Sequence, residues 1–481
     1  MKVEVPDVIE PCEQLGHVHF VGIGGAALSG LARIMAARGV TVTGSDAKDS
    51  PLLDSLRVIG IECWVGHDAG HIDGADTVVV STAIKEDNPE VVSAQERQLR
   101  LWPRSAAVQS VLLGHTAVVV TGTHGKTTTT SMLATALIST GADPSYAIGS
   151  TLTASGLNAA AGSGDIFVAE GDESDEAILV YTPTGAIVTN VDADHLDHFG
   201  TPEAYAAVFD EFVTHIEPGG FLVCCVDDPG AARLADVAER YDVEVLRVGQ
   251  AAGCDVRATA IAFVGETSTF SVSDRDKGLG TVTLQVPGLN YVVDSLAALA
   301  AGLRLGFSFG ALADGLAAFR GSARRMEFKG AVGSVRVFDS YAHHPVEIAG
   351  DLQAARAVAG EDRLVVCFQP HLFSRTRIFG AAMGASLAAA DEVVVMDVYA
   401  AREAPEPGIS GATVADAVGL DPEHVWFEPR WDSVAQRLVA LATEDSVVLT
   451  MGAGDVTEIG PQVLALLTTR EGEGTSHAAR L

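Results

Sequence analysis

Long apolar runs and basic residues are both scarce in this 481-residue sequence. No stretch reaches the roughly 18 consecutive apolar residues of a transmembrane helix, and the opening MKVEVPDVIEP has no apolar signal-peptide core. Lys and Arg number 31 against 63 Asp and Glu, a formal net charge of −32. Such a surface repels nucleic-acid phosphates and anionic membranes at long range. We therefore predict a cytoplasmic protein that binds neither nucleic acid nor membrane.

Cysteine is also sparse, and its spacing carries no signature. The six cysteines show neither the paired spacing of a metal site nor the framework of a disulfide-rich domain. Cys224 and Cys225 lie in an apolar run, where thiols usually pack in a core. Internal repeats and low-complexity segments are absent as well. A chain of 481 residues exceeds what one hydrophobic core organises, so we expect two to three domains.

Short apolar runs alternate with alanine-rich stretches of helical length, a pattern typical of βαβ units and parallel sheets. Three blocks begin with strand-like runs, at residues 17–20, 117–120 and 335–339. The first two runs lead into glycine-rich turns. We therefore predict an α/β chain of three domains, with these boundaries: residues 1–110, 111–322 and 323–481.

The first glycine-rich turn contains Gly22, Gly24 and Gly25. Glycines at such a turn let the backbone approach a phosphate, and the following helix supplies N–H groups and a positive dipole end. Asp46, which closes the next predicted strand, is placed to reach a sugar hydroxyl. On these residues alone, a dinucleotide site of a dehydrogenase and a structural turn without ligand both stay open.

The second turn, TGTHGKTT at residues 121–128, is a sharper motif. Its glycines free backbone N–H groups to cradle phosphate, an exposed Lys126 would reach the β- and γ-phosphates, and the Thr127 hydroxyl would bind Mg²⁺. Only Thr123 and His124 separate Gly122 from the Gly-Lys pair, whereas the common P-loop has four residues there. The short loop disfavours ordinary kinases and GTPases, and its presence excludes a plain dehydrogenase.

Two further strand-like runs each end in acidic residues. EGDESD begins at Glu170, and DADHLDH spans residues 192–198. The carboxyl ends of parallel strands meet at one edge of a sheet, so these acids would lie beside the phosphate loop, where a metal site is expected. Solvated loop acids and helix caps explain either segment alone. Both segments together, after a Gly-Lys-Thr loop, favour the metal site.

These motifs, in this order, resemble those of the Mur ligase family. The matching segments before residue 200 are TGTHGKTT, AEGDESD and TNVDADHLD. Two later segments, DSYAHHPVE from Asp339 and FQPHLFSRT from Phe368, resemble the alanine-adding branch of the family. The resemblance covers nearly the whole chain. The remaining segments that carry it are GSARRME at 321–327, DVYAARE at 397–403 and MGAGD at 451–455.

The resemblance implies a three-domain Mur ligase architecture. A Rossmann-like N-terminal domain would bind a UDP-sugar, a central P-loop-type ATPase domain would bind ATP, and a Rossmann-like C-terminal domain would bring the amino acid. The implied reaction is ATP- and Mg²⁺-dependent ligation of L-alanine to UDP-N-acetylmuramate through an acyl phosphate, in peptidoglycan precursor synthesis, by a monomer or weak homodimer. Two alternatives stay open: a divergent paralogue, such as a murein tripeptide ligase joining a different acid and amine, and a nucleotide-binding protein without ligase activity.

The resemblance also implies a role for each matching residue. ATP would be bound by Gly122, Thr123, His124, Gly125, Lys126, Thr127, Thr128, Asn290 and Asp339. The UDP-sugar would be bound by Gly22, Gly24, Gly25, Ala26, Ser45 and Asp46, and Mg²⁺ by Thr127, Glu170 and His195. The amino-acid end would be formed by Tyr341, His343, His371 and Arg375. Catalysis would rest on Lys126, Arg324, Arg325, His343 and Arg375, because cations stabilise a transferring phosphoryl group and guanidinium pairs with carboxylate.

The sequence departs from the family's pattern at several positions. Leu372 replaces a frequent Arg, Ser340 replaces a second Asp, and Ala27 and Leu28 replace a Gly-Met pair in the first glycine-rich turn. Each of these changes removes a polar or flexible residue from a segment with an implied role.

The adenosine segment departs as well. In an ungapped match Asn290 falls at a His, while Tyr291 and Asp294 fall at two Asn positions. An ionised carboxylate only accepts hydrogen bonds, whereas an amide also donates. We therefore predict poor discrimination of adenine. A structural alternative is that Asp294 caps the start of the helix that runs to Leu305.

Overall fold

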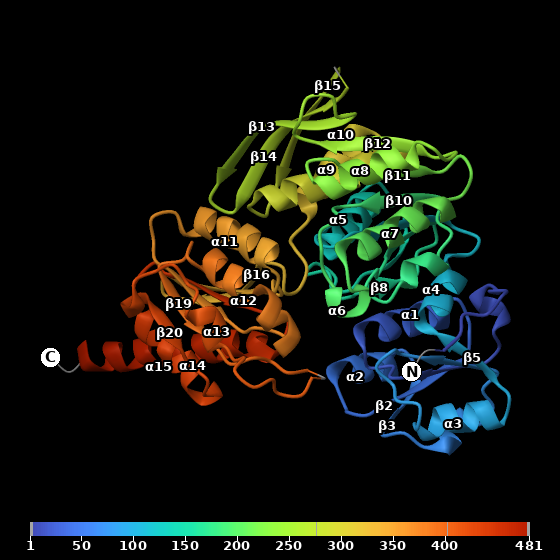
Figure 1. Cartoon of the computed structure of the whole chain (residues 1–481), viewed down its shortest axis with the longest axis horizontal. Coiled ribbons are helices and arrows are strands. Elements are labelled where there is room, and N and C mark those ends of the chain that lie inside the picture. Colours follow the sequence, from blue (N-terminus) through green and yellow to red (C-terminus); the bar gives the residue numbers. More distant parts are fainter. Residues whose placement is uncertain (1–2, 276, 402, 479–481) are drawn as a thin grey trace. The chain divides into compact units, whose positions relative to one another are not determined.

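Figure 1 shows the computed structural model of the chain, which describes residues 3–275, 277–401 and 403–478. The chain forms two compact units. The first contains Met1–Thr259, Ser271–Val282 and Val293–Phe319, and the second contains Ala260–Phe270, Thr283–Val292 and Arg320–Leu481. Arg402, which belongs to the segment DVYAARE, lies outside the described residues.

The first unit begins with a five-stranded sheet in the order β3-β2-β1-β4-β5, in which neighbouring strands are parallel. Alternate residues of a strand face opposite sides, so Phe20 and Val21 pack in two separate cores. Helix α1 contributes Leu28 to the first core and α3 contributes Val91 to the second, so both faces are covered, as in a Rossmann-like domain. The elements are β1 (Val18–Val21), α1 (Ala26–Ala37), β2 (Val42–Asp46), α2 (Pro51–Val58), β3 (Glu62–Val65), β4 (Thr77–Val80), α3 (Pro89–Glu96), β5 (Arg100–Pro103) and α4 (Arg104–Leu112).

A ten-stranded sheet follows in the order β15-β14-β13-β12-β11-β10-β6-β9-β7-β8. Strand β6 pairs in parallel with β9 and β10, so the loops that follow these three strands start at the same edge. The strands are β6 (Thr116–Thr121), β7 (Ser145–Ala147), β8 (Ala159–Ala160), β9 (Ile166–Glu170), β10 (Gly185–Val188), β11 (Phe221–Cys225), β12 (Glu244–Gly249), β13 (Val256–Val264), β14 (Thr267–Asp274) and β15 (Lys277–Leu284). The helices are α5 (Lys126–Ser139), α6 (Leu196–Phe199), α7 (Pro202–Phe212), α8 (Pro229–Ala238), α9 (Leu289–Arg304) and α10 (Phe309–Ala318).

Helix α5 follows the loop of residues 121–128, which the sequence predicts to bind phosphate. It starts directly after Gly125, and residues along most of its length are buried. A helix that is buried on all sides is held by its neighbours rather than by solvent. Gly315 of α10 approaches α5 so closely that a Cβ at this glycine would lie 2.6 Å from the Cα of Ala136. This close packing holds the C-terminal end of α5 against α10.

The second unit contains a six-stranded sheet in the order β16-β17-β21-β18-β19-β20. Only the β16–β17 pair is antiparallel; the other described pairs are parallel. The strands are β16 (Glu327–Val332), β17 (Val335–Ser340), β18 (Leu364–Phe368), β19 (Glu392–Val395), β20 (Val425–Phe427) and β21 (Val447–Met451). The helices are α11 (Pro345–Ala359), α12 (Phe373–Leu387), α13 (Ala412–Ala415), α14 (Trp431–Leu441) and α15 (Ile459–Ala478).

The three sheets and the helices between their strands confirm the predicted α/β class. Cys224 and Cys225 are buried in β11, as expected, and the six cysteines, all within the described part of the chain, form no disulfide. Within residues 3–275, 277–401 and 403–478, no helix combines the length and the hydrophobicity that crossing a bilayer requires.

Candidate active site

The loop between β6 and α5 has a backbone that favours glycine. Gly122 and Gly125 have φ angles of 128° and 80°, a region that residues with a Cβ rarely adopt. A Cβ on Gly125 would also lie 2.6 Å from Oδ1 of Asp294. The amide of His124 donates to Oδ1 of Asn190 at 2.8 Å, which ties the loop to the segment after β10. The loop thus leads directly into the N-terminus of α5, the end of a helix that favours anions.

Lys126 is largely enclosed, whereas the sequence suggested an exposed side chain; its side chain is only 18% exposed. Its Nζ donates to the carbonyl oxygens of Gly122 at 2.6 Å and Thr123 at 3.0 Å, and to Oε1 of Glu173 at 3.0 Å. Burial opposes the charged form of Lys126, but the Glu173 carboxylate and neighbouring acids outweigh this effect and raise its pKa. Lys126 is therefore a charged side chain in an ion pair with Glu173. Sequence analysis did not select Glu173 as a site residue.

Glu173 is completely buried at the centre of this loop system. The Tyr205 hydroxyl donates to its Oε1 at 3.2 Å, and the same hydroxyl lies 2.9 Å from Oγ1 of Thr123. Burial raises the pKa of Glu173 to about 7, although the Lys126 ammonium acts in the opposite direction. Its presence in the acidic segment EGDESD was the only sequence signal for this residue, and that signal does not distinguish it from the other acids.

Thr127 and Glu170, two of the three predicted metal ligands, lie together. The Thr127 hydroxyl donates to Oε1 of Glu170 at 2.9 Å, and the amide of Gly149 donates to Oε2 at 2.7 Å. A hydroxyl and a carboxylate at this distance form a pair of oxygen donors that fits Mg²⁺. His195 lies on a separate loop ahead of α6, with its Nε2 3.7 Å from Oδ2 of Asp194.

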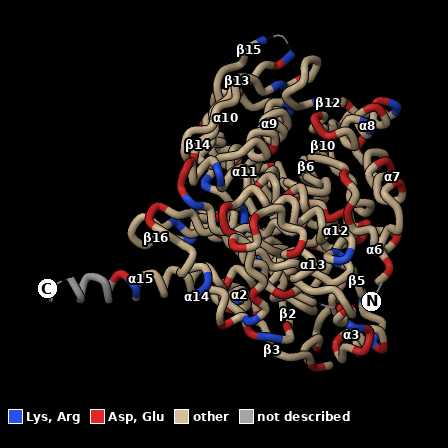
Figure 2. The backbone as a smooth tube through the Cα atoms, turned by 60° about the vertical axis from the view of Figure 1, so that its left-hand side comes forward, with Lys and Arg blue, Asp and Glu red and all other residues tan. Residues whose placement is uncertain are grey.

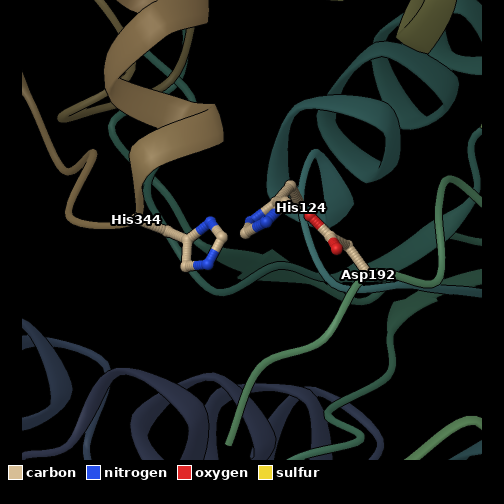
Figure 3. A group of neighbouring side chains, drawn as sticks. All are labelled: His124, Asp192 and His344. Carbon is tan, nitrogen blue, oxygen red and sulfur yellow. The ribbon is translucent and has the colours of Figure 1, made fainter. Parts of the chain in front are cut away.

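A second contact between the phosphate loop and the segment after β10 involves His124 and Asp192 (Figure 3). Ring nitrogen and carboxylate oxygen of these two side chains lie within 4.8 Å of each other; the third side chain drawn, His344, belongs to the second unit. The Thr123 hydroxyl donates to the carbonyl oxygen of Asp192 at 3.0 Å and accepts from its amide at 2.9 Å. The acidic segment after β10 therefore lies beside the loop of residues 121–128, as the sequence analysis predicts.

Arg104, at the start of α4, anchors the acidic segment after β9. Its Nη2 lies 2.9 Å from Oδ2 of Asp172 and 3.2 Å from Oδ2 of Asp175. Burial alone would raise the pKa of Asp172, but the Arg104 guanidinium outweighs it and keeps the pKa well below the usual range. Sequence analysis missed this arginine, because nothing around it in the chain resembles a binding motif.

The first glycine-rich turn brings its predicted residues together. The amide of Gly24 donates to Oδ2 of Asp46 at 2.9 Å, and the amide of Gly22 donates to the carbonyl oxygen of Ser45 at 2.8 Å. Gly25 precedes α1, and Ala26 is its first residue. Leu28, one of the departures, is a core residue of α1. The turn therefore keeps a regular helix start despite that substitution.

Ser45 is held by a buried acid that sequence analysis also missed. Its hydroxyl donates to Oε2 of Glu90 at 2.5 Å, while Nδ1 of His67 and of His71 donate to the same carboxylate at 3.0 and 2.8 Å. Glu90 is completely buried. Burial alone would raise its pKa, but the nearby His19 ring and the hydrogen bonds from Ser45 and His71 lower it to about 2. The carboxylate is thus ionised and fixes the end of β2.

In the second unit, Arg324, Arg325, Asp339 and Tyr341 form one cluster. The guanidinium of Arg324 donates to the carbonyl oxygens of Gly452 and Gly454, and its Nε lies 3.4 Å from Oδ2 of Asp339. The Tyr341 ring lies against both guanidinium groups, at 4.8 Å from that of Arg324 and 5.0 Å from that of Arg325. Asp339 is completely buried, and burial raises its pKa.

The predicted amino-acid residues form a row of rings. The ring centroids of Tyr341 and His343 lie 5.3 Å apart, those of His343 and His371 6.0 Å apart, and His371 stacks on Tyr399 at 5.8 Å. Nδ1 of His343 donates to the carbonyl oxygen of Tyr341 at 3.0 Å. Arg375 lies in the first turn of α12 and is almost completely buried.

Two of the departures have distinct structural settings. The Ser340 hydroxyl donates to the carboxylate of Asp351 in α11, so an acid still lies next to this position. Burial raises the pKa of Asp351 to about 6. Helix α9 begins at Leu289, so Asp294 lies inside the helix and not at its N-cap, which corrects the structural alternative for this residue. Asn290, in the second unit, is exposed.

Three family models match successive parts of the chain. The Mur ligase family, catalytic domain, matches residues 17–116, the Mur ligase middle domain matches residues 120–302, and the Mur ligase, glutamate ligase domain, matches residues 324–454. Together these matches cover most of the sequence.

Similar proteins with curated names include a UDP-N-acetylmuramate–L-alanine ligase of a Nocardioides species, 59% identical over 97% of this chain and 100% of the relative. One from Acidothermus cellulolyticus is 50% identical over 96% and 97%. Among solved structures, a UDP-N-acetylmuramate-alanine ligase from Thermotoga maritima is 27% identical with a TM-score of 0.80, covering 94% of this chain and 99% of the other. A murein peptide ligase from Psychrobacter arcticus is 26% identical with a TM-score of 0.69, covering 94% and 98%.

The lowered pKa of Glu90 predicts an effect on acid stability. A carboxylate whose pKa falls from 4.5 to about 2 on folding stabilises the protein above pH 4.5. That stability, roughly 3 kcal/mol at about 1.4 kcal/mol per pKa unit, is lost as the pH falls from 4.5 to about 2. We expect Glu90→Gln to unfold at lower urea concentration at neutral pH and to lose less stability on acidification.

The measurement is urea unfolding followed by tryptophan fluorescence at neutral pH and at about pH 3, where most of this stability is lost. Glu96→Gln, on the exposed end of α3, removes the same charge and is the matched control. If Glu90→Gln and Glu96→Gln behave alike at both pH values, the buried carboxylate does not stabilise this domain.

Proposed function

The chain belongs to the Mur ligase family and ligates L-alanine to UDP-N-acetylmuramate, and we propose that it does so through an acyl phosphate formed from ATP at the loop of residues 121–128. The reaction is a step in peptidoglycan synthesis. The observation that carries the proposal is the loop at the N-terminus of α5, whose backbone conformation requires glycine at Gly122 and Gly125. Next to it lie Lys126, fixed by Glu173, and the hydrogen-bonded oxygens of Thr127 and Glu170.

We assign one substrate to each of three domains. Residues 1–110 bind the UDP-sugar, residues 111–322 bind ATP, and residues 323–481 bring the amino acid. Family-model matches to residues 17–116, 120–302 and 324–454 support the division of the chain into these three parts. The enzyme works in the cytoplasm, where ATP is available, as a monomer or weak homodimer.

An amide does not form readily from a carboxylate and an amine in water, because a carboxylate is a poor electrophile. An oxygen of the muramoyl carboxylate attacks the γ-phosphorus of ATP, and the bond between that phosphorus and the ADP oxygen breaks. The amine of L-alanine then attacks the carbonyl carbon of the acyl phosphate, and inorganic phosphate leaves. Bringing two anions together on a chain with a net charge of −32 requires local positive potential. Figure 2 shows how acidic positions outnumber basic ones along the traced chain.

The central domain supplies that potential from backbone and side chain together. The N–H groups at the start of α5 face the phosphates, and Lys126 balances charge on the transferring phosphoryl group. Thr127 and Glu170, with His195 as a third ligand, hold Mg²⁺, which supplies further positive charge at the phosphates when bound. The remaining ATP contacts come from Gly122, Thr123, His124, Gly125, Thr128, Asn290 and Asp339.

The other two substrates are assigned to the flanking domains. Arg324 and Arg325 clamp phosphate, and Arg375 pairs with the carboxylate of alanine, because guanidinium binds carboxylate through two parallel hydrogen bonds. The rings of Tyr341, His343 and His371 line the amino-acid end. The UDP-sugar lies at the first glycine-rich turn, against Gly22, Gly24, Gly25, Ala26, Ser45 and Asp46.

Lys126→Ala tests the assignment of the phosphate loop. We expect loss of phosphate release with UDP-N-acetylmuramate, ATP and L-alanine by ~10²–10³-fold or more, because a cation at the transferring phosphoryl group is removed. The wild type, tested with a panel of amino acids in the same assay, should prefer L-alanine. Near wild-type turnover of Lys126→Ala would refute the loop assignment.

The variant also leaves Glu173 buried without its cation, so ionising this carboxyl at high pH becomes costly. The double variant Lys126→Ala/Glu173→Gln removes the titrating group and serves as the folding control. Both variants should be inactive, and the single variant should lose thermal stability relative to the double variant as the pH rises.

His195→Ala tests the metal assignment. Imidazole is an unusual ligand for Mg²⁺, which prefers oxygen, so the effect should be moderate and specific. We expect the Mg²⁺ concentration for half-maximal activity to rise several-fold, with a smaller change in the KM for alanine. His198→Ala, on the exposed face of α6, is the matched control. An unchanged Mg²⁺ titration would give His195 a structural role.

The residue at position 294, an aspartate, leads us to expect poor discrimination between ATP and GTP. In the ungapped match to the family it stands at an Asn position that would contact the base, and an ionised carboxylate only accepts hydrogen bonds. In the structure its side chain lies against Gly125. Losing one polar contact to the base is worth ~1–3 kcal/mol. We therefore expect GTP to be used within about tenfold to a hundredfold of ATP in kcat/KM, or a high KM for ATP.

Asp294→Asn should lower the KM for ATP and widen the difference from GTP, by about tenfold for each 1.4 kcal/mol regained. Asp314→Asn in α10 removes the same charge from an exposed position and is the matched control. Tight use of ATP by the wild type with no measurable GTP turnover would mean that the base is read elsewhere.

A further inference from the structure

The carboxylate of Glu173 has two oxygens in very different settings. Oε1 accepts from Lys126 at 3.0 Å and from Tyr205 at 3.2 Å. Oε2 is buried and, among the residues that the structure describes, has no hydrogen-bond partner. A buried carboxylate is costly unless it is paired and hydrogen-bonded. The ion pair with Lys126 is therefore the main interaction that stabilises the ionised form of Glu173 in this buried position.

The hydrogen-bonding capacity of Lys126 is fully used. An ammonium group has three N–H donors, and in this structure they point to the carbonyl oxygens of Gly122 and Thr123 and to Glu173. The lysine can bind a phosphate oxygen only by giving up at least one of these partners. Glu173 is the partner whose own charge competes most directly with an incoming polyphosphate for the same cation.

We propose that Glu173 is a proton-linked positioning residue, which holds Lys126 in the nucleotide-free enzyme and takes up a proton from solvent when the lysine turns to the phosphates. This inference rests on the proposed function of the loop as the ATP site. Protonation converts the buried carboxylate into a neutral acid, so the site avoids an unpaired buried charge. The Tyr205 hydroxyl, which lies close to Thr123 of the loop, is a hydrogen-bond partner of the acid that does not depend on Lys126.

The groups that face Glu173 favour this response. Lys126 on α5 is the cation beside it, Tyr205 on α7 is a neutral donor, and Asp172 of its own segment adds a negative charge that raises its pKa. Glu170 acts on Lys126, and Asp194 acts on Tyr205. Without the lysine, the acids and the burial remain, and both disfavour the carboxylate.

The direction of the pH effect follows. With Lys126 in place, the pKa of Glu173 is about 7, so above this pH the nucleotide-free enzyme carries an ionised Glu173. The nucleotide-bound enzyme carries a protonated one, because its pKa is higher still. Binding then takes up a proton, and nucleotide affinity falls as the pH rises above 7, by up to about tenfold per pH unit for one proton.

The test is calorimetric titration of the full chain with MgADP at about pH 8, in buffers of different ionisation enthalpy. At this pH the terminal phosphate of ADP is already ionised, since its pKa is about 6. We expect uptake approaching one proton per nucleotide in the wild type and close to none in Glu173→Gln. Glu176→Gln, an exposed acid in the same segment, should match the wild type.

The pH dependence of the wild type gives an independent readout if Glu173→Gln does not fold. Its dissociation constant for MgADP should rise by up to about tenfold per unit above pH 7. Binding without proton uptake, equal uptake in wild type and Glu173→Gln, or an affinity independent of pH would each overturn the role of Glu173 and leave the ATP site intact. Absence of MgADP binding by the folded wild type would instead overturn the proposed function and this role with it.

Discussion

The ion pair between Lys126 and Glu173 is the contact on which the central site depends. It keeps a cation in a loop whose backbone carbonyls also hold the same ammonium, on a chain that is otherwise strongly acidic. A buried pair needs rigid partners, because each charge becomes costly when the other leaves. The surrounding contacts supply that rigidity: Arg104 holds the acidic segment, and Tyr205 lies between Glu173 and Thr123.

Sheet topology explains why these groups meet. Strand β6 lies between β9 and β10, and all three run in parallel, so the phosphate loop emerges between the two acidic segments. Glu170 can then reach Thr127, and Asp192 can bond to Thr123. Ligands found outside the carboxyl ends of parallel strands are a general property of such sheets. The chemistry of the loop is thus a consequence of strand order as much as of its own residues.

The sequence alone predicted those features of the site that depend on contiguous residues. The α/β class and the position of the acidic segments beside the loop followed from glycine-rich turns and from strands that end in acids, and the pairing of Thr127 with Glu170 followed from the family resemblance. Arg104 could not be found, because it acts on Asp172 across 68 residues of chain and belongs to no motif. The enclosure of Lys126 depends on the same kind of distant packing. Helix α9 starts five residues before Asp294, so local capping rules misplaced that residue.

The departures from the family's pattern differ in what they do to charge. Ser340 lacks a carboxylate, but its hydroxyl donates to Asp351 on α11, so an acid remains next to it, now buried and with a raised pKa. At Asp294 an acid replaces a neutral amide and lies against Gly125, where phosphate is expected to bind. At the first position a carboxyl group thus remains present as the hydrogen-bond partner of Ser340. The second places a carboxyl group beside the loop that we propose binds ATP, so it is the departure that should alter how the enzyme handles its nucleotide.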